Sequence, residues 1–537
     1  MASASAQGSR WIYADFKEEW YYDLDEYLGY QWVRHSIDKF AAELRRKLLR
    51  HAFYNAVSFN LRSSPLVFLL LRKWLQNCDK NHPECRRQPR KENFWPKRVI
   101  YVGNPKKLTL VEGQSGGEDY LVLSHCWGLP TAEEKKQFCT TSENYGARKR
   151  GFSYDQLPKT FQDAVQVTRA LQKQYLWIDA LCIIQEGPDC DWDSEAKAMA
   201  DIFAGAYCTI AASSARGWGD GFLKPQPDPP GIGVQGTPST PTCTCDFGKD
   251  VDEGALMKRA WVLQERVLSR RIIHFTAAHT YCECGDGVLC EQLTKLEPPV
   301  GKQYFILDPN FPRRVRESGF QRTADFVQFL FRKYSTSCLS FATDRDVAIY
   351  SLVECMGQVL ETEVRYGIFH RFFSSLLLWR RTYKNKTPPI PYEDRTVPSW
   401  SWMAYSGGIE FIADSTQVLM VPRRVDLGFN KDGEALNVQV RKFGGNCRVE
   451  DKGEEHAIVD GTEQVGSLWL DVADQIRLED CSCVVVSIAR DKKEDARKTC
   501  HVLVIWEKAG GGGYERVGVG KVEAQYVSSD CVAGTLW

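Results

Sequence analysis

Two short apolar runs constrain the fold of this chain more than any other feature of its sequence. They are YLVLSHCWG at residues 120–128 and YLWIDALCIIQ at residues 175–185. Each run is interrupted by polar side chains, at Ser124 and His125 in the first and at Asp179 in the second. A buried strand that ends in polar groups is typical of α/β proteins, which present their chemistry at the carboxyl edge of a parallel sheet.

The segment between these runs has the spacing of a helix. Within residues 161–171, largely apolar side chains recur at i, i+3, i+4, i+7 and i+10. Thr160 and Asp163 predict a capping box at the start of this helix. The unit is therefore predicted to be a strand, a helix and a second strand.

Further elements are predicted on both sides of this unit. A glycine-rich connection is expected at 113–117, and helices near 193–206 and 260–268. The remaining strands of the α/β domain are expected at 98–103, 208–213, 271–275 and 280–284.

The character of the sequence divides the chain into four parts. Residues 1–97 are expected to be an N-terminal helical segment, and residues 98–300 the α/β domain, with a signature core at 118–275. Residues 301–398 are predicted to be a helical region. Residues 399–537 are predicted to be mostly β, because short β-branched runs alternate there with glycine-rich turns.

Composition argues against several classes of protein. The chain carries 69 basic and 69 acidic side chains, so it lacks the basic field of a broad nucleic-acid surface. The N-terminus has no apolar core of a secretory signal, and the longest apolar run, at 66–71, is far shorter than a membrane span. The 19 cysteines are odd in number and widely spread, so they are expected to be reduced thiols of a cytosolic or nuclear protein, with a cytoplasmic location preferred. Neither nucleic acid nor a membrane is expected as a partner.

Four long motifs follow one another in the α/β domain. They are YLVLSHCWG, LPKTFQDAVQVTRALQKQYLWIDALCIIQ, DWDSEAKAMADIFAGAYCTIAAS and RAWVLQERVLSRRIIHF. In this order they resemble the fungal heterokaryon-incompatibility (HET) domain. Weaker similarity to the wider family is found in CDKNHPEC upstream and in VPSWSW and YERVG downstream.

This resemblance implies a role in self/non-self recognition that ends in regulated cell death. The HET domain is also similar to Toll/interleukin-1 receptor (TIR) domains, which have a flavodoxin-like parallel sheet. Some TIR domains cleave NAD with a glutamate that is carried on a helix. The resemblance therefore implies a flavodoxin-like core and raises NAD hydrolysis as a hypothesis.

Glu195 is the first candidate for a catalytic residue. In a helix that begins near Asp193, it shares one side with Met199 and Ile202. A carboxylate that faces the core must be paired, hydrogen-bonded or used, and here it would stabilise the oxocarbenium-like ribose of NAD. The TIR pattern also places a tryptophan before its glutamate, but four residues before it, whereas Trp192 precedes Glu195 by three. The structural alternative is that Glu195 complements the helix N-terminus.

A second helix offers an alternative carboxylate. Trp261, Gln264, Glu265 and Leu268 fall at i, i+3, i+4 and i+7. Glu265 is the second catalytic candidate, with Gln264 and Trp261 as substrate contacts. A buried polar network that ties this helix to the sheet is the favoured structural explanation.

The tips of the two apolar runs supply the other candidate contacts. Ser124 and His125 are adjacent on a strand and point to opposite faces, so direct activation of the serine by the histidine is disfavoured. Substrate contact by Ser124 and His125, with Trp127 and Gly128 shaping the loop, is the preferred hypothesis. Asp179 is expected either to orient a ligand hydroxyl or to cap the next turn.

The cysteines suggest zinc only superficially. Cys78, His82 and Cys85 have ligand-like spacing, but no fourth ligand is evident nearby. Distant ligands could be joined by Cys282, Cys284 and Cys290, or by Cys243 and Cys245, but neither cluster has the paired C-x2-C form of a zinc site. No metal is therefore expected, and Cys182 is expected to be a small buried residue. Neither a P-loop nor a dinucleotide fingerprint occurs, so no cofactor is expected and NAD enters only as a candidate substrate.

Three functional hypotheses follow, and the third of them is a zinc-dependent or thiol-based regulator. In the first, the chain is a cell-death effector with a TIR-like NAD glycohydrolase core, switched on by a protein partner or by self-association. In the second, it is a non-catalytic signalling scaffold that binds death-pathway partners through its HET surface.

Overall fold

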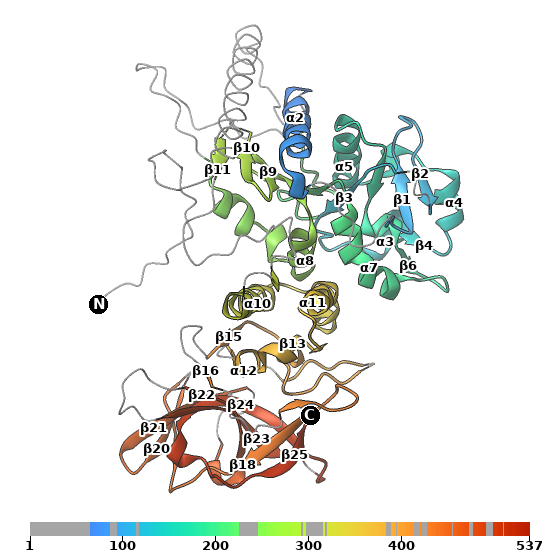
Figure 1. Cartoon of the computed structure of the whole chain (residues 1–537). Helices are drawn as coiled ribbons and strands as arrows, with labels where there is room; N and C mark the ends of the chain where they lie inside the picture. Colours follow the sequence, from blue (N-terminus) through green and yellow to red (C-terminus); the bar gives the residue numbers. More distant parts are fainter. Residues whose placement is uncertain are drawn as a thin grey trace, which may run out of the picture. The chain divides into compact units, whose positions relative to one another are not determined.

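The computed structural model describes most of the chain. It covers residues 65–85, 94–113, 117–224, 245–291, 294–296, 315–316, 319–382, 388–393, 395–412, 419–420, 427–453, 455–471, 476–489, 498–508 and 510–537. The chain divides into two compact units (Figure 1). The first comprises Met1–Glu195, Asp201–Met257 and Ser269–Pro309, and the second Ala196–Ala200, Lys258–Leu268 and Asn310–Trp537.

A nine-stranded sheet is the frame of the first unit. Its strand order is β11-β10-β9-β8-β7-β3-β5-β1-β2. The strands are β1 (Arg98–Tyr101), β2 (Thr109–Glu112), β3 (Tyr120–Ser124), β5 (Tyr175–Trp177), β7 (Cys208–Ala211), β8 (Arg271–Phe275), β9 (Thr280–Cys284), β10 (Gly287–Cys290) and β11 (Thr294–Leu296). Two further strands, β4 (Thr140–Thr141) and β6 (Ile184–Glu186), pair with each other.

The four central strands of this sheet are parallel. β3 lies between β5 and β7, and β8 is on the far side of β7, with Val122 opposite Trp177 and Thr209. The strands on both flanks are antiparallel. Every residue of β3 and β7 is buried, which is why these strands are continuous apolar runs rather than alternating ones. The predicted α/β class is confirmed as a mixed α/β fold with a parallel centre.

The helices of the first unit precede the first strand or connect the strands that follow it. They are α2 (Pro65–Asn81), α3 (Ala132–Phe138), α4 (Tyr145–Arg150), α5 (Lys159–Ala170), α6 (Asp179–Cys182) and α7 (Trp192–Gly205). Shorter turns are η2 (Pro83–Cys85), η3 (Tyr154–Gln156) and η4 (Gly248–Asp252). Of the N-terminal helices that the sequence predicts, only α2 lies within the described residues.

The predicted capping box at the start of α5 is wrong. Pro158 is the N-cap residue and makes no side-chain cap. Thr160 instead donates its hydroxyl to the carbonyl of Gly217, 2.9 Å away. Asp163 accepts from the backbone N–H groups of Phe222 and Leu223, at 2.7 and 3.0 Å. These tertiary hydrogen bonds hold the loop after β7, and they prevail over the local capping pattern.

Helices also begin the second unit. They are α8 (Ala260–Leu268), α10 (Phe320–Ser335), α11 (Val347–Val359) and α12 (Phe373–Leu376), with η5 (Leu256–Lys258), η6 (Ala342–Asp344), η7 (His370–Phe372) and η8 (Trp402–Ala404). The region predicted to be helical also contains the short strands β12 (Val364–Arg365), β13 (Ile368–Phe369) and β14 (Trp379–Arg381). β12 pairs with β13, and β14 pairs with β15 (Ile409–Phe411), which lies in the region predicted to be mostly β.

A ten-stranded sheet forms most of the rest of the second unit. Its strands β22, β23, β24, β25 and β18 pair successively, and β18 pairs again with β22, which closes a ring. The strands are β16 (Leu419–Met420), β17 (Gly428–Phe429), β18 (Leu436–Arg441), β19 (Arg448–Asp451), β20 (His456–Asp460), β21 (Glu463–Leu470), β22 (Ser482–Ala489), β23 (Thr499–Glu507), β24 (Tyr514–Glu523) and β25 (Val532–Leu536), with η9 (Leu478–Asp480) and η10 (Ala524–Tyr526).

A buried ion pair joins this sheet to β14. Arg516 on β24 donates from Nε to Asp471 Oδ2, at 2.9 Å, and both side chains are fully buried. Its other donors reach the backbone carbonyls of Leu377 and Trp379, at 2.8 and 2.5 Å. The guanidinium also lies over the ring of Trp379, 3.5 Å from its centroid. The charge of Arg516 is therefore matched by one carboxylate and by carbonyl oxygens.

The cysteines are expected to be reduced thiols, and most of those within the described ranges are free. Cys245 and Cys290 instead form a disulfide, which corrects that expectation at this pair. The other cysteines within the described ranges are free, and Cys243 lies outside those ranges. Among the described residues, no helix is long and apolar enough to cross a membrane.

Candidate functional site at the carboxyl edge of the parallel strands

The polar ends of the parallel strands lie at one edge of the first unit. β3 ends at Ser124 and β7 at Ala211, and Ala212 donates its backbone N–H to the carbonyl of Ser124, at 2.9 Å. Strand order reverses between β3 and β7, because the chain crosses from β3 to β5 on one side and then to β7 on the other. Open α/β sheets bind ligands at the carboxyl edge beside such a reversal.

His125, Trp127 and Asp179 come together at this edge. The Trp127 indole Nε1 donates to Asp179 Oδ2, at 2.8 Å, and His125 Nε2 is 3.8 Å from Asp179 Oδ1. Asp179 Oδ1 also accepts from the backbone N–H of Ala180, at 2.7 Å, and Asp179 is the first residue of α6. The carboxylate therefore holds both the start of α6 and the loop of Trp127, although the N-cap residue of α6 is Ile178 rather than Asp179.

Gly128 fixes the course of the loop that follows β3. Its φ is +75°, and a Cβ there would lie 3.1 Å from the Cα of Gly217. The rings of Trp127 and Trp218 lie 5.1 Å apart beside this approach of two backbones. A side chain at position 128 would therefore be strained in this loop.

Three serines also lie at this edge, and the sequence singles out only Ser124. Ser213 and Ser214 follow β7, and their hydroxyl groups are buried with no hydrogen-bond partner among the described residues. Ser124 is itself buried, with 3% of its surface exposed. Buried hydroxyls that lack partners are costly to retain, which marks Ser213 and Ser214 as additional candidate ligand contacts.

Arg98 organises a charged cluster at the same edge, next to β5. β1 is antiparallel to β5, with Ile100 opposite Leu176, so Arg98 lies near the carboxyl end of β5. Arg98 is 1% exposed and donates to Asp191 Oδ2, at 2.5 Å, and to the carbonyl of Cys182, at 2.6 Å. The sequence predicts the strand but not this burial, because Asp191 is 93 residues away along the chain.

Asp191 is the carboxylate of this cluster whose charge is matched by cations and hydrogen bonds. It also accepts from Lys97 Nζ, at 2.7 Å, and from the backbone N–H of Ile184, at 3.0 Å. Burial alone would raise the pKa of Asp191, but its hydrogen bonds with Lys97 and Arg98 hold that pKa below the ordinary value. Asp191 is therefore ionised and fully engaged.

Glu195 is a second carboxylate of this cluster, and no cation among the described residues pairs with it directly. It lies in the first turn of α7 on one side with Met199 and Ile202, as predicted, and only 6% of its surface is exposed. Its side chain makes no hydrogen bond or ion pair with any described residue. Burial raises the pKa of Glu195, and the nearby Arg98 guanidinium offsets part of this effect.

The remaining candidates lie on α7 and α8. Trp192 is the first residue of α7 and is partly exposed. Trp261, Gln264 and Glu265 lie on α8 as predicted, but α8 belongs to the second unit and is described by itself. Both amide atoms of Gln264 are buried without a hydrogen-bond partner among the described residues, so the expected polar network does not include that side chain.

The structure groups one set of metal-ligating side chains that the sequence leaves incomplete. Cys78, His82, Cys85 and Cys284 place their ligand atoms within 4.8 Å of one another. Cys284 supplies the fourth ligand, which the sequence does not show because Cys284 is far along the chain from the other three residues. Cys182, by contrast, is a fully buried small residue, as expected.

Three comparisons with known proteins gave one match, which covers the segment that carries the candidate site. Neither a search of curated proteins nor a search of solved structures gave a match to the chain. The segment from the first residue of β3 to Glu265 of α8 contains the parallel strands β3, β5 and β7 and the carboxylates described above. This segment, residues 120–265, matches the family model of the heterokaryon incompatibility protein (HET).

Proposed function

We propose that this protein is a heterokaryon-incompatibility-type effector of self/non-self recognition and regulated cell death. The match of residues 120–265 to the HET family model supports this role. We further propose that it acts by TIR-like hydrolysis of NAD at the carboxyl edge of the parallel strands. The order β5-β3-β7-β8 corresponds to 2-1-3-4 in chain order, which supports a flavodoxin-like core.

One observation carries the catalytic part of this proposal. Glu195 is buried and makes no hydrogen bond or ion pair among the described residues, although Arg98 and Lys97 are close enough to influence its ionisation. Those two cations are already bound by Asp191. A buried carboxylate without a direct partner costs stability, and such groups concentrate at functional sites.

The chemistry suits an oxocarbenium-like transition state. As nicotinamide leaves, positive charge develops on the ribose, and the carboxylate of Glu195 would stabilise that charge or hold the ribose hydroxyl groups. The raised pKa means that the group ionises at a higher pH than an exposed glutamate. Activity should therefore fall on the acid side at a pH above the ordinary glutamate range.

The test compares NAD turnover by the full chain and by Glu195→Ala. Protein that is concentrated, or joined to an inducible dimerising tag, is incubated with NAD, and nicotinamide release is measured by chromatography. Loss of a carboxylate that stabilises the transition state should lower turnover by about 100-fold or more. Asp193→Ala is the matched control, because Asp193 is an exposed acid in the same helical turn. Equal turnover by wild type and Glu195→Ala would remove Glu195 from the mechanism.

A second candidate function is a non-catalytic scaffold that binds death-pathway partners through the HET surface. It is favoured by the engagement of Asp179, which is already held by Trp127 and by its own turn. Toxicity on expression that survives both Glu195→Ala and Glu265→Ala, with cellular NAD unchanged, would support the scaffold and contradict the hydrolase.

A further inference from the structure

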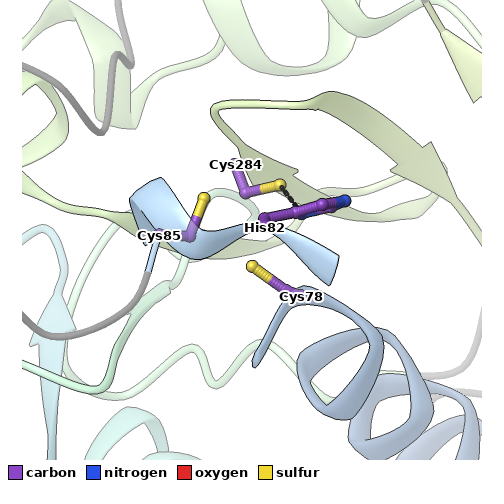
Figure 2. A group of neighbouring side chains, drawn as sticks. All are labelled: Cys78, His82, Cys85 and Cys284. Carbon is purple, nitrogen blue, oxygen red and sulfur yellow. Dashed lines mark hydrogen bonds between the residues drawn. The ribbon is translucent and has the colours of Figure 1, made fainter. Parts of the chain in front are cut away.

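Four potential metal ligands meet away from the carboxyl-edge site. Cys78 is near the end of α2, His82 follows it, Cys85 ends η2, and Cys284 is the last residue of β9. Figure 2 shows their side chains pointing toward a common centre, with a hydrogen-bond distance of 3.5 Å between Cys284 Sγ and His82 Nδ1. The three thiols are free and buried, and all four ligand atoms lie within 4.8 Å of one another.

This donor set has the composition of a closed structural zinc site. Structural zinc takes four protein ligands in a tetrahedron, and Cys₃His is one of its usual sets. Zn–S bonds of about 2.3 Å separate two sulfur ligands by about 3.8 Å, so the ligands need to contract only slightly. We propose that Cys78, His82, Cys85 and Cys284 bind one zinc ion.

The orientation of the imidazole fits this role. His82 Nδ1 faces the sulfur atoms, whereas His82 Nε2 lies 3.2 Å from Asp286 Oδ2. A histidine ligand commonly donates its second ring N–H to a carboxylate, which fixes the tautomer and the ring orientation. Asp286 is itself held by Lys295 Nζ, at 2.9 Å. Asp286 is therefore a positioning residue for the ligand His82.

A buried arginine suits the charge of the filled site. Three thiolates, one neutral imidazole and one Zn²⁺ sum to a single negative charge, and binding releases the three thiol protons. Arg271 on β8 is 3% exposed and donates to the carbonyls of Leu75 and Cys85, at 3.4 and 3.5 Å. It also pairs with Asp79, at 2.7 Å. The guanidinium thus holds α2 and η2, which carry Cys78 and Cys85, and places positive charge beside these ligands.

The site would connect segments far apart in the chain. His82 and Cys284 are separated by 202 residues, so one ion would fasten α2 and η2 to the antiparallel flank of the sheet. All four positions are filled by protein, which leaves no open position for a substrate. The proposed zinc is therefore structural, and it does not depend on NAD hydrolysis.

The experiment measures metal in the full-length protein. Wild type is purified under reducing conditions without chelator, and zinc is determined by mass spectrometry. We expect about one zinc ion per chain, and a loss of at least five-fold in Cys284→Ser. Cys282→Ser is the matched control, because Cys282 is a buried free thiol on the same strand that is outside the ligand set. It should retain the metal.

Wild-type measurements keep the proposal testable if a variant fails to fold. Cobalt exchanged into wild type should give the visible absorption of a tetrahedral thiolate site, and chelation should lower the melting temperature. Asp286→Asn should weaken zinc affinity by about 10-fold without removing the site. Wild type that contains no zinc and takes up no cobalt would overturn the proposal. Iron with acid-labile sulfide in place of zinc, or equal zinc loss in folded Cys282→Ser, would also overturn it.

Discussion

Each unit of this protein buries an arginine beside an aspartate, and the two clusters are completed differently. In the second unit, Arg516 and Asp471 form a pair whose remaining donors reach backbone carbonyls. In the first unit, Arg98 and Lys97 share Asp191, and a second acid, Glu195, is buried next to them without a direct partner. A satisfied pair has a structural role, whereas a surplus carboxylate requires another explanation.

Removal of Arg516 should have the largest effect on stability. Arg516→Met leaves Asp471 charged and fully buried without its partner, which we expect to cost about 3–5 kcal/mol in unfolding free energy. Hydrogen exchange of peptides from β24, measured against denaturant, would report this loss within the second unit. Arg448→Met is the control, because its pair with Glu450 is exposed. A loss below about 1 kcal/mol would show that the pair does not hold this sheet to β14.

Loss of the ion pair in the Arg98 cluster should lower stability less than loss of the Arg516 pair. Asp191→Ala removes the carboxylate from Arg98 but leaves the hydrogen bond to the carbonyl of Cys182, so we expect a cost of about 2–3 kcal/mol. Hydrogen exchange of β1 peptides provides the measurement. Asp119→Ala is a matched control from a partly exposed pair with Lys173 and should cost under about 1 kcal/mol. Equal effects of both variants would contradict the structural role of Asp191.

These clusters also show what the sequence could predict. Local patterns sufficed for α8, for β8 and β9 at their observed bounds, and for the stripe that places Glu195 beside Met199. Apolar runs and helical periodicity depend on neighbours in the chain, so one sequence contains that information.

The features that the sequence did not predict depend on contacts between residues far apart in the chain. Nothing near Arg98 indicates that it is buried, since its acceptor Asp191 is in another motif. Local pattern predicts that Asp163 caps a helix, but in the structure it accepts hydrogen bonds from the N–H groups of Phe222 and Leu223. Cys284 likewise joins His82 only when β9 is placed in the sheet. Pairing across such separations follows from the topology rather than from local pattern.

Two buried groups, His501 in the second unit and Glu195 in the first, should affect stability in opposite directions as the pH changes. Burial lowers the pKa of His501 to about 4. The folded chain binds this proton less tightly than the unfolded chain, whose value is 6.5. Stability present above pH 6.5 is therefore lost as the pH falls toward 4, by about 1–2 kcal/mol between pH 7 and 5. His501→Gln should flatten this part of the profile, measured by hydrogen exchange of β23. An unchanged profile would contradict the prediction.

Glu195→Gln should give the smallest change in unfolding free energy, and the pH dependence that it removes has the opposite sign to that of His501. Burial raises the pKa of Glu195 above its ordinary value of 4.5, so the folded chain binds this proton more tightly than the unfolded chain. Wild type therefore loses stability as the pH rises from about 4.5 through the folded pKa, whereas the glutamine variant does not. At neutral pH the variant should be more stable by up to about 1 kcal/mol, and near pH 4 the two should agree. Hydrogen exchange of α7 and β3 peptides at both pH values measures the difference. A variant that is less stable at neutral pH would mean that Glu195 has a stabilising partner, and the surplus charge that separates the two clusters would disappear.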